Sequence, residues 1–305
     1  MKIALIGQAA FGEKVLESLL IEKEEVVVVY LPPDSASGKN ETLKELAVAN
    51  GIPVRQPVRM RDPEVYEDYK QFGAELNVMA FVTDIVPASI LNHPPLGTIQ
   101  YHPSLLPRHR GASAINWAII NGETKTGLTI FWPDEGLDTG PILLQKEVDI
   151  EPDDTVGSLY FNKLFPLGVD AILESIRLIK EGRAPKIPQD LSEGEYEPVC
   201  RAMKIDWMYP VSVVYNVIRG CNPSPGATTT YRGQAVKIFD CEKHRISGPQ
   251  TPSTVTEITE DGFLVASSGG SIFVKRVQPA GGAKMPAGEF ARSAGLAVGD
   301  RLGED

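Results

Sequence analysis

Apolar residues along the first 180 positions follow two patterns in turn. Short runs rich in Val, Ile and Leu predict buried strands, over residues 2–6, 25–31, 76–81, 98–101, 126–132 and 142–150. Between these runs, apolar residues recur every three or four positions, which indicates helices, over residues 11–20, 41–50, 62–71, 112–120 and about 156–180. The alternation predicts an α/β domain over residues 1–182, with a mostly parallel sheet and flanking helices.

The rest of the chain has a different pattern. Residues 183–203 contain several prolines and no clear period, and are therefore predicted to form a linker. A short helix is expected over residues 211–219. The short β-like runs that follow predict a small β barrel or an open sheet, over residues 227–231, 234–241, 253–258, 263–266 and 271–277. The second predicted domain is residues 204–305.

Two reactive side chains follow predicted strands in the middle of the chain. His102 comes directly after the strand over residues 98–101. Asp138 lies in a glycine-flanked turn after the strand over residues 126–132, and the glycines leave the backbone free to aim its carboxylate. Both side chains are expected beyond the C-terminal ends of strands, which is where ligands bind in open α/β sheets.

The motifs around these residues resemble those of a known family. HPSLLP, which begins at His102, and GLDTG, which contains Asp138, have the order found in 10-formyltetrahydrofolate-dependent formyltransferases. The family includes methionyl-tRNA formyltransferase, glycinamide ribonucleotide formyltransferase and the hydrolase domain of 10-formyltetrahydrofolate dehydrogenase. The sequences around the two motifs are most similar to those of that hydrolase domain. The later segments KIDW, IRGCNPSPGA and VGDRLG resemble the C-terminal domain of methionyl-tRNA formyltransferase, which implies an OB-like barrel.

The resemblance implies a catalytic role for three residues. In formyl transfer a nucleophile loses a proton, an oxyanion forms and the folate nitrogen gains a proton. His102 would act as acid and electrophile, because an imidazole exchanges protons near neutral pH, and Asp138 as base and orienter. Gln100 occupies the position of an asparagine that helps hold the oxyanion in the transferases. Its extra methylene displaces the amide by roughly 1.5 Å, so transfer and hydrolysis both stay open.

The resemblance also implies a folate site. Backbone groups that follow the strand over residues 76–81 would bind the pterin ring, at Asp84, Ile85 and Val86. The turn after His102 would shape the site, together with Asp138, through Ser104, Leu105, Leu106 and Pro107. We therefore expect 10-formyltetrahydrofolate and tetrahydrofolate as donor and product. Neither a metal nor a nicotinamide is implied, and the glycines near the N-terminus do not form the G-x-G-x-x-G pattern of a dinucleotide site.

Composition bears on compartment and partner. The chain of 305 residues is 42% hydrophobic and 23% charged, an ordinary globular balance. No apolar run approaches the roughly 20 residues that span a bilayer, so no membrane partner is expected. Three cysteines without metal-like spacing favour a reducing, cytoplasmic setting. Arg108, His109 and Arg110 form a basic cluster that either faces an anionic acceptor or forms a solvated turn.

Charge disfavours a nucleic-acid acceptor. The net charge is −10, with −12 before residue 201 and +2 from there on, and the loop over residues 32–40 holds one Lys and one Asp. Tight binding to tRNA usually needs several phosphate contacts. The sequence therefore predicts an enzyme that passes the formyl group of 10-formyltetrahydrofolate to a small molecule or to water. A methionyl-tRNA formyltransferase is the close alternative, and a folate-binding module with little turnover is the alternative of another class. The oligomeric state stays open.

Overall fold

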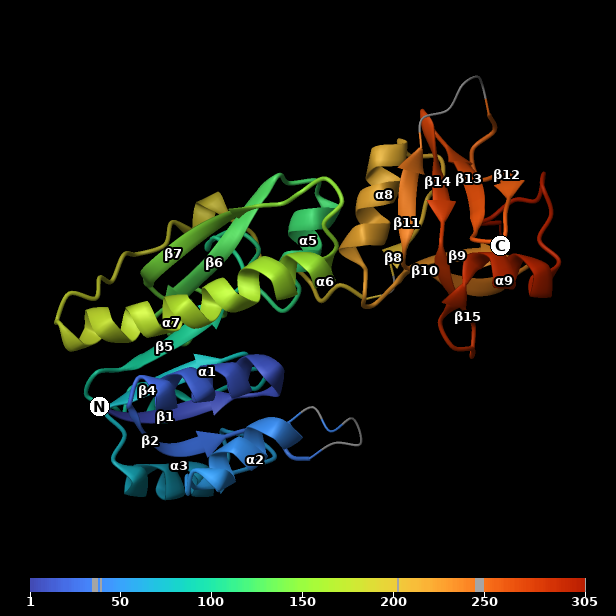
Figure 1. The fold of residues 1–305 in the computed structure, drawn as a ribbon. Helices are drawn as coiled ribbons and strands as arrows, with labels where there is room; N and C mark the ends of the chain where they lie inside the picture. The colour runs from blue at the N-terminus through green and yellow to red at the C-terminus, as the bar shows by residue number, and fades with distance from the viewer. Residues whose placement is uncertain (35–37, 39, 202, 245–249, 305) are drawn as a thin grey trace. The chain divides into compact units, whose positions relative to one another are not determined.

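The structure is a computed structural model that describes residues 1–305 except 35–37, 39, 202, 245–249 and 305. The chain packs into two units, each built from three segments that are separate in the sequence (Figure 1). The first unit comprises Met1–Ala112, Gly127–Val148 and Phe161–Glu197, and the second comprises Ser113–Thr126, Asp149–Tyr160 and Pro198–Asp305. Part of the loop over residues 32–40, whose charge bears on tRNA binding, lies outside the described residues.

The first unit is organised on a seven-stranded sheet of order β3-β2-β1-β4-β5-β6-β7. Its strands are β1 (Lys2–Gly7), β2 (Glu25–Tyr30), β3 (Val54–Arg55), β4 (Leu76–Ala80), β5 (Thr98–His102), β6 (Lys125–Phe131) and β7 (Ile142–Asp149). The five strands from β3 to β5 pair in parallel, whereas β6 is antiparallel to β5. The predicted α/β domain with a mostly parallel sheet is confirmed.

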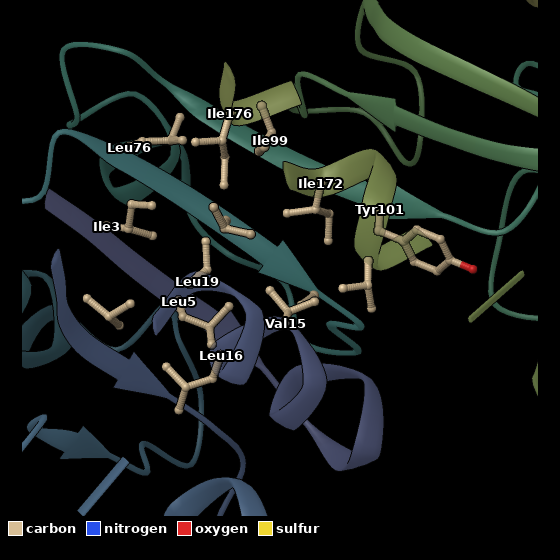
Figure 2. Packing of buried hydrophobic residues seen from close by; sticks show 14 of the residues in the cluster. Ile3, Leu5, Val15, Leu16, Leu19, Leu76, Ile99, Tyr101, Ile172 and Ile176 are labelled. Carbon is tan, nitrogen blue, oxygen red and sulfur yellow. The ribbon is translucent and has the colours of Figure 1, made fainter. Parts of the chain in front are cut away.

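Helices cover both faces of this sheet, as a buried parallel sheet requires. They are α1 (Ala9–Ile21), α2 (Glu41–Ala49), α3 (Pro63–Tyr69), α4 (Ala88–Leu91) and α7 (Phe165–Lys180), with short 3₁₀ turns at Lys70–Phe72 and Leu191–Glu193. Alternate residues of β1 serve the two faces, so that Ile3 and Leu5 belong to one core cluster and Ile6 to the other. Figure 2 shows the first cluster, to which Leu16 of α1 and Ile172 of α7 belong together with Ile3 and Leu5 of β1.

The helix predicted over residues 156–180 is interrupted. It consists of α6 (Val156–Leu159), a π-helical segment at Tyr160–Leu164, and α7. Pro166 lies in the first turn of α7, where it has no N–H to continue the hydrogen bonding of the preceding turns. At the start of α6, Thr155 and Ser158 form a reciprocal cap in which Ser158 takes the place usually held by Glu or Gln.

The second unit contains α5 (Ala114–Ile120), α6, α8 (Val211–Gly220), α9 (Ala287–Ala294) and two sheets. One sheet has the order β16-β15-β10-β9-β8, and the other β11-β14-β13-β12. Their bounds are β8 (Met203–Lys204), β9 (Ala227–Tyr231), β10 (Gln234–Ile238), β11 (Cys241–His244), β12 (Val255–Ile258), β13 (Phe263–Ser267), β14 (Gly270–Val274), β15 (Arg276–Pro279) and β16 (Met285–Pro286). The two sheets share one hydrophobic cluster.

Two predicted strands of this unit are each divided between the sheets. The run over residues 234–241 becomes β10 and the start of β11, and the run over residues 271–277 becomes β14 and the start of β15. The two crossings are joined, because Lys275 N–H donates to the Asp240 carbonyl at 2.8 Å. An antiparallel β domain is thus present, but the OB-like barrel is not confirmed.

The segment predicted as a linker, residues 183–203, is divided between the two units. Up to Glu197 it belongs to the first unit, where Ile187 pairs with Ile142 through two backbone hydrogen bonds. The predicted domain limits at 182 and 204 stay predictions, since packing divides the chain at other positions. In the described part of the chain, no helix is long and apolar enough to span a membrane.

Leu16 tests how far the first unit depends on the contact between α1 and the sheet. Leu16 is fully buried and Ile21, at the end of the same helix, is 69% exposed. Leu16→Ala should lower the free energy of unfolding by about 2–5 kcal/mol, because it removes buried methyl groups and leaves a cavity. Ile21→Ala should change it by less than about 0.5 kcal/mol. Urea denaturation of both variants measures the difference, and equal losses would contradict the assigned packing.

Candidate active site

His102 is the last residue of β5 and its side chain is buried, with an exposed fraction of 5%. The ring nitrogen Nε2 lies 2.9 Å from the backbone carbonyl oxygen of His109. A carbonyl oxygen only accepts, so Nε2 carries the hydrogen of this bond. The other nitrogen, Nδ1, faces Asp138, and the distance from Nδ1 to Asp138 Oδ2 is 3.6 Å. Nδ1 is therefore the nitrogen that is free to take up or release a proton.

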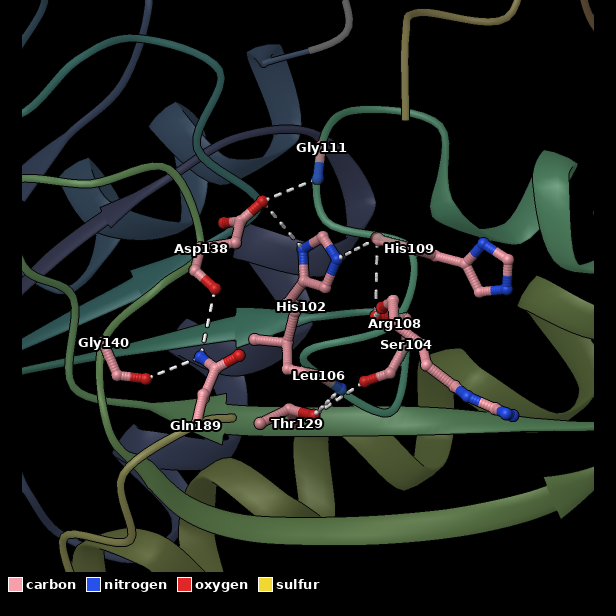
Figure 3. Close-up of polar contacts among 10 residues, drawn as sticks. All are labelled: His102, Ser104, Leu106, Arg108, His109, Gly111, Thr129, Asp138, Gly140 and Gln189. Atoms are coloured by element: carbon pink, nitrogen blue, oxygen red, sulfur yellow. Dashed lines mark hydrogen bonds and ion pairs between the residues drawn. The ribbon is translucent and has the colours of Figure 1, made fainter. Parts of the chain in front are cut away.

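Asp138 lies beside His102, but not for the reason that the sequence predicts, namely that β5 and β6 end at the same edge of the sheet. Because β6 runs antiparallel to β5, the two strands end at opposite edges of the sheet. His102, the last residue of β5, pairs with Thr129, and the chain of β6 then runs back along β5 to its own last residue, Phe131, which pairs with Gln100. The loop between β6 and β7 carries the carboxylate to His102 instead (Figure 3). Asp138 is 7% exposed, has a left-handed backbone with φ of 56°, and accepts a hydrogen bond from Gly111 N–H at 2.8 Å.

The turn after His102 is held by hydrogen bonds from the side chains of Thr129, Gln145 and Ser104. Thr129 Oγ1, on β6, donates to the carbonyl oxygen of Ser104 at 2.7 Å and accepts from Leu106 N–H at 3.1 Å. Gln145 on β7 donates to the same hydroxyl and to the Leu106 carbonyl oxygen. Ser104 Oγ donates to the Arg108 carbonyl oxygen at 2.6 Å. These bonds fix the shape of the turn that the sequence assigns to the folate site (Figure 3).

The basic cluster after this turn has mostly structural contacts. His109 is buried, and its Nδ1 lies 3.3 Å from Glu197 Oε1. Arg110 donates to the Gly194 carbonyl oxygen at 3.1 Å. Arg108 is exposed. His109 and Arg110 therefore form neither the solvated turn nor the anion-facing cluster that the sequence left open; they attach the 194–197 segment to the site.

Gln100 lies on β5, the strand that carries His102, and Asp84 follows the neighbouring strand β4. Gln100 occupies the same face of β5 as His102, two residues earlier, and is partly exposed. Asp84 is engaged structurally, because its carboxylate accepts from Met60 N–H at 2.7 Å and from Ile85 N–H at 2.8 Å. Ile85 has an exposed side chain and Val86 a buried one.

A cavity of about 260 Å³ lies beside the strand exit in the first unit. Asp84 lines it together with residues from the ends of β1 and β2, among them Gln8, Tyr30 and Pro32. Burial, together with the charge of Asp68, raises the pKa of Tyr30, and its hydroxyl donates to Asp68 Oδ2 at 3.1 Å. His102 and Asp138 do not line this cavity. Within the described residues, no cluster of three or more His, Cys, Asp or Glu side chains could hold a metal ion.

The 183–197 segment contributes contacts around Asp138 that the sequence does not predict. Gln189 donates to the backbone carbonyl oxygens of Asp138 and Gly140, at 3.0 and 2.6 Å. Trp132, at the start of the same loop, donates through Nε1 to the Pro185 carbonyl oxygen at 2.9 Å. A proline-rich segment without a period carries no signal for such contacts, since they are made to backbone atoms and leave no charge or apolar pattern.

Fold and site together define an α/β protein with a buried imidazole–carboxylate pair suited to acid–base chemistry. The sequence model described as "Formyl transferase" matches residues 1–174, and the model described as "Formyl transferase, C-terminal domain" matches residues 201–295. The chain belongs to the formyl transferase family. The resemblance read from the two motifs is thereby confirmed.

Curated relatives divide into two groups. Cytosolic 10-formyltetrahydrofolate dehydrogenase of Mus musculus is 42% identical over 308 residues, which are 95% of this chain and 34% of that protein. This chain thus spans about a third of the length of those dehydrogenases. Methionyl-tRNA formyltransferase of Syntrophus aciditrophicus (strain SB) is 38% identical over 310 residues, and the match covers 99% of both chains.

Solved structures share the fold at lower identity. HypX from Aquifex aeolicus, in complex with tetrahydrofolic acid, superposes with a TM-score of 0.73 and 18% identity, over 98% of this chain and 48% of that one. WlaRD, a sugar 3N-formyl transferase, superposes with a TM-score of 0.67 and 20% identity, over 90% of this chain and 97% of that one. These similarities establish the fold alone.

Thr129 tests the construction of the turn. Thr129→Val keeps the shape of the side chain but leaves the buried Leu106 N–H and Ser104 carbonyl oxygen without this partner. We expect the free energy of unfolding to fall by about 1–3 kcal/mol. Thr42→Val, which removes an exposed hydroxyl bonded to Glu13, should cost less than about 0.5 kcal/mol. Chemical denaturation compares the two, and a Thr129 variant as stable as the Thr42 variant would exclude the hydroxyl as a determinant.

Proposed function

We propose that this protein is an enzyme that removes the formyl group from 10-formyltetrahydrofolate and passes it to a small-molecule amine or to water. The observation that carries the proposal is the buried pair of His102 and Asp138, placed by the two motifs that the family resemblance identified. Support for the donor comes from the relatives named for 10-formyltetrahydrofolate and from the folate bound to HypX.

The geometry supports a division of labour within the pair. The carbonyl of His109 holds Nε2–H of His102, so Nδ1 is left to donate a proton to the oxyanion or to the departing folate nitrogen. Asp138 Oδ2 is occupied by Gly111 N–H, while Oδ1 has no hydrogen-bond partner among the described residues. Oδ1 is therefore the atom that accepts a proton from the attacking amine or water.

Two exposed apolar side chains, on segments that the resemblance implies for the folate site, support a flat, partly apolar donor. Ile85, after β4, is 69% exposed, and Leu137, next to Asp138, is 56% exposed. We propose that the backbone of Asp84, Ile85 and Val86 contacts the pterin ring and that residues 104–107 close the other side. Ile85 N–H is already bonded to the Asp84 carboxylate, which leaves the backbone carbonyls of the segment and the N–H groups of Asp84 and Val86 to contact the ring.

Gln100 leaves both transfer and hydrolysis open. Its amide lies on the face of β5 that carries His102, in the position from which an oxyanion could be held. The longer side chain displaces that amide relative to an asparagine by roughly 1.5 Å. We propose that Gln100 assists at the oxyanion and that its displacement favours a small acceptor.

A methionyl-tRNA formyltransferase is the second candidate. The specific observation in its favour is the 38% identity to the Syntrophus enzyme over 99% of both chains. Against it stands the charge of −12 before residue 201. A folate-binding module with little turnover is the third candidate. Detection of any product whose formation depends on Asp138 would exclude it.

Asp138→Asn should abolish formyl release while binding of tetrahydrofolate persists, because an amide oxygen cannot take the proton that the transition state must lose. His102→Ala should fail in the same way, and the double variant should lose no more than either single one. Formate and formylated product, with and without candidate amines, are measured together with folate absorbance.

Asp170→Asn, an exposed carboxylate on α7, is the matched control and should behave as the unsubstituted protein. Full turnover by Asp138→Asn would exclude Asp138 as the proton acceptor. Equal folate binding by the two variants shows that the loss is one of chemistry and not of folding.

Initiator methionyl-tRNA should be a poor acceptor. Affinity for a polyanion depends on phosphate contacts, and each contact steepens the dependence on salt. We expect formylation of this tRNA to be slow at physiological salt and to be lost steeply as salt rises, while release to water or a small amine changes little. Efficient formylation at physiological salt would reverse this order and make the tRNA enzyme the preferred function.

A further inference from the structure

The Asp138 loop is closed by one carboxamide from a distant part of the chain. Gln189 Nε2 donates to the Asp138 carbonyl oxygen at 3.0 Å and to the Gly140 carbonyl oxygen at 2.6 Å. A carboxamide nitrogen has two hydrogens, and both are used on the two carbonyls that flank Thr139. Figure 3 shows the nitrogen of Gln189 directed at these carbonyls.

The orientation of this carboxamide follows from chemistry. Asp138 and Gly140 present carbonyl oxygens, which only accept, so the atom between them is the nitrogen of Gln189 and not its oxygen. The oxygen, Oε1, is buried and has no hydrogen-bond partner within the described residues. The hydrogen bonds of the side chain are thus concentrated on the loop.

Gln189 is delivered by a segment that is itself fixed. Ile187 exchanges two backbone hydrogen bonds with Ile142, the first residue of β7, at 2.8 and 2.9 Å. The Pro185 carbonyl oxygen accepts from Trp132 Nε1, which belongs to the residue directly after β6. The segment is therefore tied to both ends of the Asp138 loop before Gln189 bonds to its middle.

The backbone of Asp138 has an uncommon conformation. Its φ of 56° lies in the left-handed region, which residues with a Cβ adopt infrequently, although aspartate does so more often than most. Its carboxylate is held by one backbone hydrogen bond, from Gly111. We propose that Gln189 is a positioning residue for the reaction: by bonding to the carbonyls of Asp138 and Gly140 it keeps the carboxylate beside His102. The inference rests on the proposed function of that pair.

Gln189→Met tests the proposal, because methionine keeps the length of the side chain and removes both donors. We expect kcat for formyl release to fall about 10- to 100-fold, since a displacement of about 1 Å can cost on the order of 100-fold. The KM for 10-formyltetrahydrofolate should stay within about twofold, because Gln189 contacts the loop and not the donor. Gln189→Asn, which keeps the amide on a shorter stem, should lie between the two proteins.

Exchange of the Gly111 amide hydrogen gives a readout that does not depend on activity. That hydrogen is bonded to Asp138 Oδ2, so it should exchange faster in Gln189→Met, while amides of β4 keep their rates. Gln71→Met removes an exposed glutamine that bonds to the Glu67 carbonyl oxygen, and should change neither kcat nor the exchange of Gly111.

Three outcomes would overturn the positioning role. They are an unchanged kcat in Gln189→Met, an unchanged Gly111 exchange rate, and a loss of kcat accompanied by an equal rise in KM and by faster exchange throughout β4. If the unsubstituted protein releases no formyl group to any acceptor, the proposed function fails. Faster Gly111 exchange in Gln189→Met would then still show that the hydrogen bonds of Gln189 hold the Asp138 loop in place.

Discussion

The site depends on holding one aspartate in the left-handed backbone region. Most residues with a Cβ give up about 1–2 kcal/mol there, whereas aspartate adopts it more readily; Asp138 occupies it with its carboxylate bonded to Gly111 N–H. The loop is packed so closely that a side chain at Gly140 would collide with the Trp132 carbonyl oxygen. Close packing at Gly140 and the hydrogen bond from Gly111 hold the Asp138 carboxylate next to the His102 ring. Nε2 of that ring is held in turn by the His109 carbonyl oxygen. The sheet and its helices provide the rigid base for this arrangement.

Much of the first unit could be predicted because its signals are local. Apolar runs give β1, β2 and β4, and the spacing of Phe11, Val15 and Leu19 gives α1. The pairing of His102 with Asp138 was also predicted, but for an incomplete reason. Composition marks β6 as buried without showing that it runs antiparallel to β5, since an apolar run has no direction. The motifs HPSLLP and GLDTG indicated that His102 and Asp138 belong to one site, which the order and direction of the strands could not indicate.

What could not be predicted has no local pattern. Helix α9 was missed because its buried residues are mostly small, such as Ala287, Gly288 and Ala291, so no stripe of large apolar side chains marks it. The divided strands of the second unit were missed because a continuous apolar run does not show where a chain leaves one sheet for another. Gln189 was missed because a bond from a side chain to a distant backbone is a property of the fold and not of either segment.

The division into units has a consequence for the order in which the protein is completed. The chain passes between the two units five times, so no single cut separates them. A growing chain that ends at residue 182 already contains every strand of the first sheet, together with His102 and Asp138. It still lacks Gln189, and it leaves Trp117 and Ile120 without the core against which they pack. During synthesis His102 and Asp138 are therefore present before Gln189, and the hydrogen bonds that the 183–197 segment makes around them form only when the chain has extended to Glu197.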